Sequence, residues 1–231
     1  ISGVMSLRKP QEKSLKILEE IMTSINIKKG MNLKVALGRV HALYPICSDF
    51  ERDFMSLTFA LATGVGKTRL MGAFIAYLYT QHDVKNFFVV APNTTIYEKL
   101  KKDLSDQSNP KYVFKGLGCF HTAPQIITDD DYKSRQISLF ESDIRIFVFN
   151  IDKFNKEESN MKKINEFIGD SFYQYLANLP DLVLINELNP LLGLELTATP
   201  IVTSGSKQTP FKNVVYEYPL SKAIEDGYTR T

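Results

Sequence analysis

Residues 61–68, with the sequence Leu-Ala-Thr-Gly-Val-Gly-Lys-Thr, combine the residue types that bind a chain of phosphates. Gly64 and Gly66 allow backbone N–H groups to approach phosphate oxygens, and a helix that begins just after them adds a favourable dipole. We expect the Lys67 ammonium group to reach the β- and γ-phosphates and the Thr68 hydroxyl to bind Mg²⁺. The pattern therefore predicts a phosphate-binding loop for a nucleotide.

The elements on either side of this loop are those that it requires. Residues 56–60 are apolar and β-branched, which favours a strand, and residues 69–79 have the composition and spacing of a buried helix. The motif depends on this context of strand, loop and helix. Leu61 stands where such loops usually begin with glycine. A chance Gly-Lys-Thr in an ordinary turn is the alternative, and the complete context argues against it.

Three other segments place polar groups at the ends of predicted elements. Gln11 lies at the start of a predicted helix, and its amide can donate and accept at once, as the reading of an adenine edge requires. In Ala-Pro-Asn-Thr-Thr (91–95), hydroxyls and helix-start N–H groups could hold phosphates of a nucleic acid strand, although an ordinary capped turn has the same residues. In Thr-Ala-Thr-Pro (197–200), small hydroxyl residues at a strand end could link a nucleotide site to a second domain.

Predicted strands and helices alternate along the chain, which indicates an α/β fold with a doubly wound parallel sheet. Besides the elements around the loop, the pattern predicts helices at 10–24, 96–104 and 221–226, and a largely helical segment at 157–179. It predicts strands at 86–91, 112–120, 125–127, 143–150, 181–185, 192–197 and 214–218. Residues 26–53 have a mixed pattern, and we expect a connecting insert with at least one helix there.

The composition is that of an ordinary folded protein, and it disfavours several functional classes. The chain has 231 residues, 44% of them hydrophobic and 23% charged, which suffices for a substantial core in one large or two small domains. No apolar run is long enough for a membrane span, and the first residues lack the pattern of a secretory signal. Cys47 and Cys119 lie far apart and the histidines are scattered, which disfavours a metal site and suits the reducing cytoplasm. The net charge of +2 predicts no general affinity for nucleic acid.

Several longer segments resemble a known family. They are LRKPQ, FALATGVGKTRLMGAFIAYLY, FFVVAPNTTIYEKL, KYVFKG, IFVFNIDKFN, DLVLI, LLGLELTATP and FKNVVYEYPLSKAIEDGY, between Leu7 and Tyr228. In wording and spacing they are similar to the helicase-type ATPase (Res) subunit of type III restriction enzymes, within the DEAD/DEAH-box helicase superfamily. The resemblance implies a RecA-like P-loop NTPase motor domain at residues 56–231, after a helical segment with an adenine-reading motif at residues 1–55. It also implies a second RecA-like domain and a nuclease centre, which we expect to lie outside this chain.

The resemblance further implies a function, that of an ATP-driven helicase or translocase on double-stranded DNA that works with a modification methyltransferase subunit. ATP and Mg²⁺ would be its cofactors. The implied ATP-binding residues are Arg8, Gln11, Thr63, Gly64, Val65, Gly66, Lys67 and Thr68. Lys67 and Thr68 would act in catalysis, and Thr68 would bind the metal. The implied DNA contacts are Pro92, Asn93 and Thr94, and the residues that couple hydrolysis to movement are Thr197 and Thr199.

Three other functions remain open. A related DEAD/DEAH-box helicase would act on RNA or on other DNA substrates, and the duplex that stimulates ATP hydrolysis would distinguish it. A nucleotide-binding module without hydrolysis would show no ATPase activity. A small-molecule kinase would leave the Thr-Ala-Thr-Pro and Pro-Asn-Thr-Thr segments without a role.

An acidic pair that would complete the metal site is missing from its expected place. The strands predicted at 181–185 and 192–197 both read as central parallel strands, which need a crossover of about a dozen or more residues. Only residues 186–191 lie between them, and Pro190 discourages a helix there. The resemblance places Asp-Glu-Ala-His directly after the first of these strands. We therefore predict that residues carrying this motif are missing between Ile185 and Asn186; the alternative is a continuous chain in which Glu187 serves as the acid.

Overall fold

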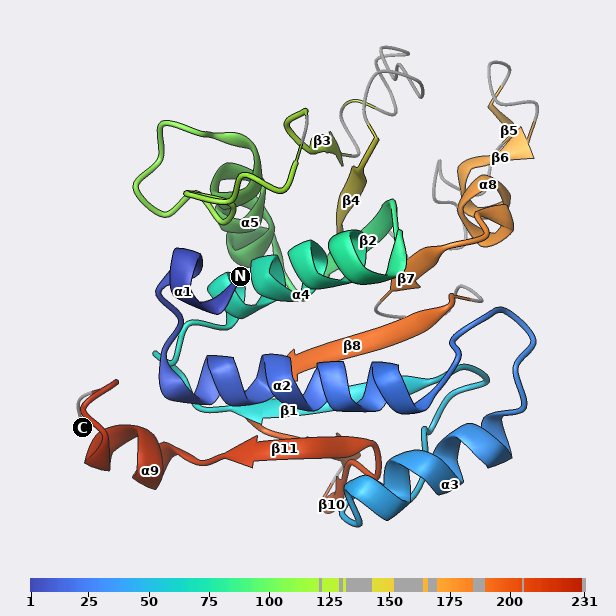
Figure 1. Cartoon of the computed structure of the whole chain (residues 1–231), viewed down its shortest axis with the longest axis vertical. Coiled ribbons are helices and arrows are strands. Elements are labelled where there is room, and N and C mark those ends of the chain that lie inside the picture. Colours follow the sequence, from blue (N-terminus) through green and yellow to red (C-terminus); the bar gives the residue numbers. More distant parts are fainter. Residues whose placement is uncertain are drawn as a thin grey trace. The chain divides into compact units, whose positions relative to one another are not determined.

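The computed structural model describes residues 1–120, 122–128, 131, 143–151, 164–165, 170–184, 190–204 and 206–229 (Figure 1). These residues divide into two compact units. The terminal unit comprises Ser6–Phe74 and Leu191–Thr231, and the middle unit comprises Ile75–Pro190 with Gly3–Met5 of the short helix α1 (Ser2–Met5). The chain passes from one unit to the other within helix α4 (Lys67–His82) and after Pro190.

The terminal unit is built on a three-stranded parallel ladder in the order β11-β1-β8. Its strands are β1 (Ser56–Leu61), β8 (Leu192–Thr197) and β11 (Val214–Tyr218). Every residue of β1 is buried, as expected of a central strand in a parallel sheet. Ala60 pairs with Thr197, and Leu61 pairs with Tyr218. The ends of all three strands therefore meet beside the residues that follow β1.

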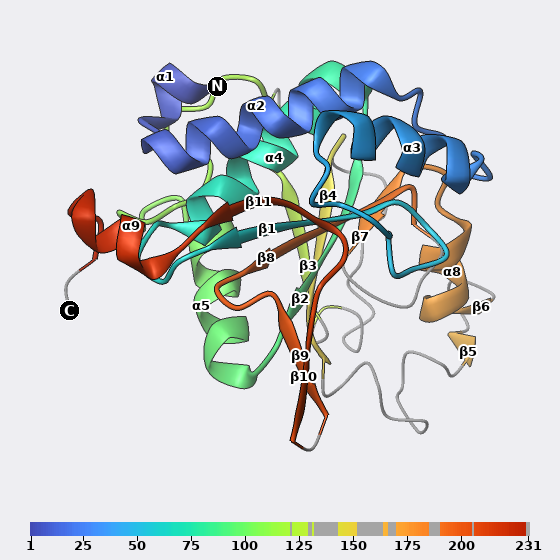
Figure 2. The ribbon, with the colours of Figure 1, turned by 90° about the horizontal axis from the view of Figure 1, so that it is seen from below.

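Two helices lie on one face of this ladder (Figures 1 and 2). Helix α2 (Lys9–Ser24) contacts both β11 and α3 (Leu33–Leu43). The apolar residues of α2 recur at helical spacing, and those that are buried are Leu15, Ile17, Leu18, Ile21 and Met22. The Asn32 side chain caps α3 by accepting hydrogen bonds from the backbone N–H groups of Lys34 and Val35. This confirms the predicted helix in the segment 26–53.

Buried polar side chains connect the three strands. The Thr58 hydroxyl of β1 lies 2.8 Å from Asn213 Oδ1 and 3.1 Å from Glu195 Oε2 of β8. Asn213, just before β11, donates through its Nδ2 to Ser56 Oγ at 2.9 Å. Buried polar groups are tolerated when they are hydrogen-bonded to one another, so these partners favour the observed register over a shifted one.

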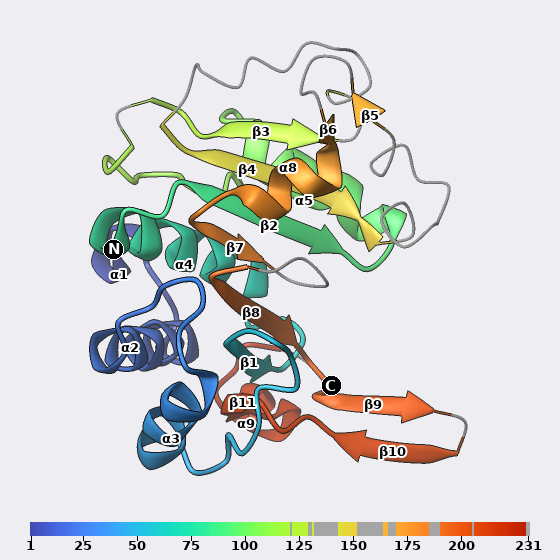
Figure 3. The same ribbon diagram turned by 90° about the vertical axis from the view of Figure 1, so that its right-hand side faces the viewer.

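The middle unit contains a four-stranded parallel ladder in the order β7-β2-β4-β3 (Figure 3). Its strands are β2 (Asn86–Ala91), β3 (Gln125–Thr128), β4 (Arg145–Asn150) and β7 (Leu182–Leu184). Helix α5 (Thr94–Ser105) lies on one face of this ladder and α8 (Phe172–Asn178) on the other (Figures 2 and 3). Parallel strands with helices on both faces confirm the predicted α/β, doubly wound fold class.

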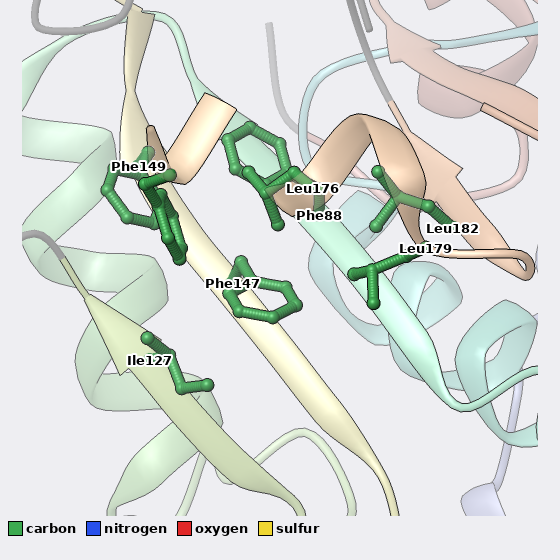
Figure 4. Packing of buried hydrophobic residues seen from close by; sticks show 8 residues of the cluster. Phe88, Ile127, Phe147, Phe149, Leu176, Leu179 and Leu182 are labelled. Atoms are coloured by element: carbon green, nitrogen blue, oxygen red, sulfur yellow. The ribbon is translucent and has the colours of Figure 1, made fainter. Parts of the chain in front are cut away.

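Aromatic side chains fill the space between this ladder and α8 (Figure 4). Phe147 and Phe149 occupy alternate positions of β4 and so point to the same face. Their ring centroids lie 5.7 and 5.6 Å from that of Phe172 in α8. Phe88 of β2 stacks on Phe149 with a centroid distance of 5.3 Å. The aliphatic members of the cluster are Ile127, Leu176, Leu179 and Leu182.

Most predicted elements are confirmed, with ends that differ by a few residues. The helix predicted at 221–226 is α9 (Leu220–Glu225). The strand predicted at 112–120 is wrong, because this segment forms consecutive turns and Val113 donates to the carbonyl oxygen of Asp103. Aromatic side chains of this segment pack on one another, with the ring centroids of Phe114 and Phe120 5.1 Å apart. The strand-like sequence pattern of this segment therefore reflects packing of these rings and not pairing with another strand.

The helix predicted at 157–179 is wrong in part. Within the described residues of this range, β5 (Ile164–Asn165) pairs with β6 (Asp170–Ser171) in an antiparallel arrangement, and only α8 is helical. Ser171 caps the start of α8, since its hydroxyl accepts a hydrogen bond from Gln174 N at 3.1 Å. The rest of the predicted helix lies outside the described residues.

A hairpin that the sequence did not predict follows β8. Its strands are β9 (Ile201–Ser204) and β10 (Lys207–Pro210), which pair with each other (Figure 3). All residues of both strands are exposed, so they carry no pattern of alternating burial from which a strand could be predicted. Within the described parts of the chain, no helix is long and apolar enough to cross a membrane.

Candidate nucleotide-binding site

The loop between β1 and α4 has the backbone conformation that its glycines permit. Gly64 and Gly66 have φ angles of +85° and +97°, in the left-handed region that other residues rarely adopt. Ala62 N donates to the carbonyl oxygen of Tyr218 at 3.0 Å, which ties the start of the loop to the end of β11. Val65, within the loop, is fully buried. Helix α4 then begins at Lys67, so its first N–H groups follow directly on the loop, as phosphate binding requires.

Lys67 is held by backbone oxygens of the same loop. Its Nζ donates to the carbonyl oxygens of Leu61 at 2.9 Å and Ala62 at 3.3 Å. Burial lowers the pKa of the Lys67 ammonium group. Both acceptors are neutral, so the positive charge is not neutralised by them and is available to an anionic ligand.

Gln11 and Arg8 connect the start of α2 to this loop. The Gln11 side chain is buried, and its Nε2 donates to the carbonyl oxygen of Gly66 at 2.8 Å while its Oε1 accepts from Arg8 N at 2.7 Å. Arg8 Nη1 donates to the carbonyl oxygen of Gly64 at 2.6 Å. The structure therefore brings both residues to the loop. The Gln11 amide retains one N–H and one lone pair, so its role in reading adenine stays a prediction.

Two residues that the sequence analysis missed also contact this loop. A Cβ atom at Gly64 would lie 3.1 Å from Thr229 Cβ and 3.2 Å from the carbonyl oxygen of Tyr228. The Arg8 guanidinium lies over the Tyr228 ring, 5.1 Å from its centroid. No motif marks Tyr228 and Thr229, because they reach the loop only through the turn that follows α9. Their position after Gly227 (φ +72°) is the one local signal of such a turn.

The structure describes the predicted metal ligand, Thr68, but not the place predicted for the acidic pair. Thr68 is the second residue of α4 and is half-buried. Among the described residues, no group of three or more His, Cys, Asp or Glu side chains comes together. Phosphate oxygens and water commonly supply further ligands to a Mg²⁺ ion held beside a nucleotide, as they would beside Thr68. The predicted break between Ile185 and Asn186 lies outside the described residues.

Thr197 and Thr199 lie at the end of β8, in the same unit as the loop. Thr199 N donates to Thr197 Oγ1 at 3.1 Å, and the Thr197 hydroxyl lies 3.1 Å from the carbonyl oxygen of Thr199. Because Thr197 pairs with Ala60 in the ladder, it sits beside the strand that leads into the loop. This arrangement is consistent with coupling between the two segments, which stays a prediction.

Pro92, Asn93 and Thr94 belong to the middle unit, where all three are exposed. Asn93 caps α5, with its Oδ1 accepting from Ile96 N at 2.9 Å. Asn150, at the end of β4, donates through Nδ2 to Thr94 Oγ1 at 3.2 Å. The helix start is therefore ordered and exposed, but the Asn93 side-chain oxygen already serves as a cap.

Together, the residues around the loop fit a nucleoside triphosphate. Backbone N–H groups, a helix N-terminus and the Lys67 ammonium group, which in the described part of the chain has neutral hydrogen-bond partners, converge where glycines leave no side chain in the way. A Cβ atom at Gly66 would lie 2.6 Å from Gln11 Nε2, so a side chain at this position would displace the Gln11 amide. This arrangement is consistent with a polyphosphate ligand, and the role of Thr68 as a metal ligand stays a prediction.

Comparison with known proteins identifies the family. The chain is 26% identical over 173 residues to the tRNA(Met) cytidine acetyltransferase TmcA of Saccharolobus islandicus (strain Y.G.57.14 / Yellowstone #1). The match covers 74% of this chain and 22% of that protein, so the chain spans less than a quarter of this relative's length. The family model described as type III restriction enzyme, res subunit, matches residues 4–202, which include the loop and Thr197-Ala-Thr-Pro. The chain therefore belongs to the family of type III restriction enzyme res subunits, as a helicase-like domain with a RecA-like P-loop fold.

Proposed function

We propose that the chain is an ATP-driven motor domain that moves on double-stranded DNA as part of a type III restriction enzyme. The observation that carries the proposal is the loop itself. Gly64 and Gly66 hold left-handed conformations, and among the described residues the Lys67 ammonium group is bound by neutral carbonyl oxygens. In such a site, phosphoryl transfer depends on positioning and on compensation of charge rather than on covalent chemistry by the protein.

Each residue of the site has a distinct task in this proposal. The loop N–H groups hold phosphate oxygens, and Lys67 exchanges the carbonyl oxygens of Leu61 and Ala62 for oxygens of the β- and γ-phosphates. Thr68 contributes its hydroxyl to Mg²⁺, which, when bound with ATP, compensates the charge that develops on the phosphates. Arg8 and Gln11 support the loop from α2 and face the base.

Movement on DNA requires contributions beyond the nucleotide site. We assign Pro92, Asn93 and Thr94 to the DNA backbone, because an exposed helix start offers N–H groups and a hydroxyl to phosphates. Thr197 and Thr199 would transmit the state of the loop through their strand beside Ala60. A second RecA-like domain would supply the arginine that completes hydrolysis, and a modification methyltransferase subunit would direct the motor to its DNA.

The test is ATP hydrolysis by the protein as its gene encodes it, without nucleic acid and with duplex DNA. We expect stimulation by duplex DNA and loss of hydrolysis in Lys67→Ala, with unchanged thermal unfolding. Lys13→Ala removes a lysine of α2 that lies over the Tyr216 ring, 5.1 Å from its centroid, and serves as the control for loss of positive charge. Equal rates in Lys67→Ala and the unaltered protein would refute the assignment of the loop.

A second candidate is a motor that acts on RNA. It is favoured by the similarity to a protein whose name states that it acts on tRNA(Met). The same assay distinguishes the two, with duplex RNA added at the same concentration as duplex DNA. Stimulation by RNA alone would favour this candidate over the restriction enzyme.

A further inference from the structure

The turn after α9 is held against the phosphate-binding loop by contacts within the terminal unit. The Tyr218 hydroxyl donates to Asp226 Oδ2 at 2.5 Å, which fixes the end of α9 to the end of β11. Tyr228 N donates to the carbonyl oxygen of Ala223 at 2.8 Å and closes the turn. Gly227 adopts a left-handed conformation within it. The backbone of this turn thereby delivers the Tyr228 ring to the edge of the loop.

Arg8 is fixed in orientation by two contacts of different kinds. One face of its guanidinium lies over the Tyr228 ring at 5.1 Å, and its Nη1 donates to the Gly64 carbonyl oxygen at 2.6 Å. Arg8 is nevertheless an exposed residue, so its guanidinium is accessible to a ligand. A flat, accessible cation that already lies over one aromatic ring is a surface on which a second flat π-system can stack.

We propose that Tyr228 is a positioning residue for base recognition, holding the Arg8 guanidinium so that it stacks on the purine base of the bound nucleotide. The inference rests on the proposed function, because the loop must first hold the phosphates. Arg8 is bound to Gly64 of that loop, so the stacking surface lies next to the phosphate chain, where a base joined through a ribose would fall. Tyr228 itself touches no phosphate in this arrangement and acts through Arg8.

An alternative role for the pair is contact with the phosphates themselves, since a guanidinium also binds phosphate oxygens. Inorganic tripolyphosphate separates the two roles because it has phosphates and no base. We would measure binding of a non-hydrolysable ATP analogue and of tripolyphosphate, both with Mg²⁺, by titration calorimetry on the unaltered chain and its variants. Thermal unfolding would be recorded for each variant.

We expect Tyr228→Ala to weaken binding of the ATP analogue by about threefold to thirtyfold, the range of a cation–π contact, and to leave tripolyphosphate binding unchanged. Tyr228→Phe keeps the ring and should bind both ligands as the unaltered chain does. Lys13→Ala is the matched control, because it removes a cation–π pair of the same centroid distance, 5.1 Å, on the neighbouring Tyr216. It should bind both ligands normally.

Each other outcome decides against the inference. If Tyr228→Ala weakened the binding of both ligands equally, the ring would support the loop or the phosphates. That result would overturn the role in base recognition and leave the proposed function standing. Unchanged binding of the ATP analogue would do the same. Absence of tripolyphosphate binding by the unaltered chain would overturn the proposed function, and this inference with it.

Discussion

The side-chain amide of Gln11 donates a hydrogen bond of 2.8 Å to the carbonyl oxygen of Gly66, across 55 residues of sequence. The same amide accepts from the backbone of Arg8, so the start of α2 and the phosphate-binding loop are fixed to each other. A change of loop conformation would therefore be transmitted to α2. Loss of the Gln11 amide would leave buried polar groups without their hydrogen-bond partners.

The first prediction concerns the close approach of Gly66 to Gln11. In Gly66→Ala, the added Cβ would lie 2.6 Å from Gln11 Nε2, and the backbone would keep a φ of +97° that alanine disfavours. We expect a loss of about 1–3 kcal/mol in the free energy of unfolding, since the amide must move and the left-handed backbone is strained. Denaturant unfolding followed by circular dichroism measures it.

The control for this substitution is Gly38→Ala in α3. A Cβ atom at Gly38 would meet nothing within 4 Å, and the residue lies inside a helix. Alanine should therefore raise the free energy of unfolding by about 0.5–1 kcal/mol. If Gly66→Ala proves as stable as the unaltered chain, the contact between Gln11 and the loop is not as close as described.

The second prediction concerns the pH dependence of phosphate binding. Burial lowers the pKa of Lys67, and only its ammonium form attracts phosphate. Affinity for tripolyphosphate should be greatest below that pKa and should fall as the pH rises through it, before an ordinary lysine would lose its proton. Titrations between about pH 7.5 and about pH 10.5 cover this range.

Lys67→Arg supplies the comparison for this pH series. A guanidinium stays charged throughout the range, so the affinity of the variant should be nearly constant with pH, whatever its absolute value. A parallel decline in the variant and the unaltered chain would show that another group controls the pH dependence.

How far the sequence predicted this site depends on how local each contact is. The phosphate-binding loop, its strand and its helix lie within one short stretch, so glycine spacing and apolar pattern were enough to predict them. Gln11 was predicted as a candidate because its residue type and helix-start position suggested it. Its bond to Gly66 could not be predicted, since it depends on how α2 packs on β11.

The contact of Tyr228 with the loop and the structure of segment 112–120 were not predicted from the sequence. Tyr228 reaches the loop through a turn whose course depends on the contacts of Tyr218 and Ala223, none of which leaves a periodic pattern. At 112–120, aromatic residues resemble a strand in composition, but their rings are buried against one another and the backbone turns. The strand predicted there was wrong, because packing overrode β propensity.

The third prediction concerns Thr197. In Thr197→Val the shape is nearly kept, but the hydroxyl that binds Thr199 N is lost. We expect nucleotide binding to be unchanged and hydrolysis stimulated by nucleic acid to fall about tenfold or more, as for loss of a coupling contact of about 1.4 kcal/mol. Titration calorimetry and a steady-state ATPase assay report the two properties separately.

Thr23→Val on α2 is the matched control for this substitution. Its hydroxyl is exposed and donates only to the carbonyl oxygen of Glu19, one helical turn earlier. Both nucleotide binding and stimulated hydrolysis should be normal. If Thr197→Val weakens nucleotide binding as much as it slows hydrolysis, the residue supports the site rather than coupling it.

The last prediction is that the natural protein contains residues between Ile185 and Asn186 that are absent from this sequence. β7 ends at Leu184 and β8 begins at Leu192, and each runs parallel to its neighbour in the ladder of its own unit. Consecutive strands of a doubly wound fold are joined by crossovers of about a dozen or more residues, which 185–191 cannot supply. An Asp-Glu pair in the missing stretch would give Mg²⁺ and the attacking water the acid that ATP hydrolysis requires. The intact mass of the protein purified from its natural source, with peptide sequencing across this region, should reveal the added residues. A peptide in which Ile185 is joined directly to Asn186 would refute the prediction. Two hypotheses would then remain, a nucleotide-binding module without hydrolysis and a chain in which Glu187 serves as the acid. An ATPase assay of Glu187→Gln would distinguish them.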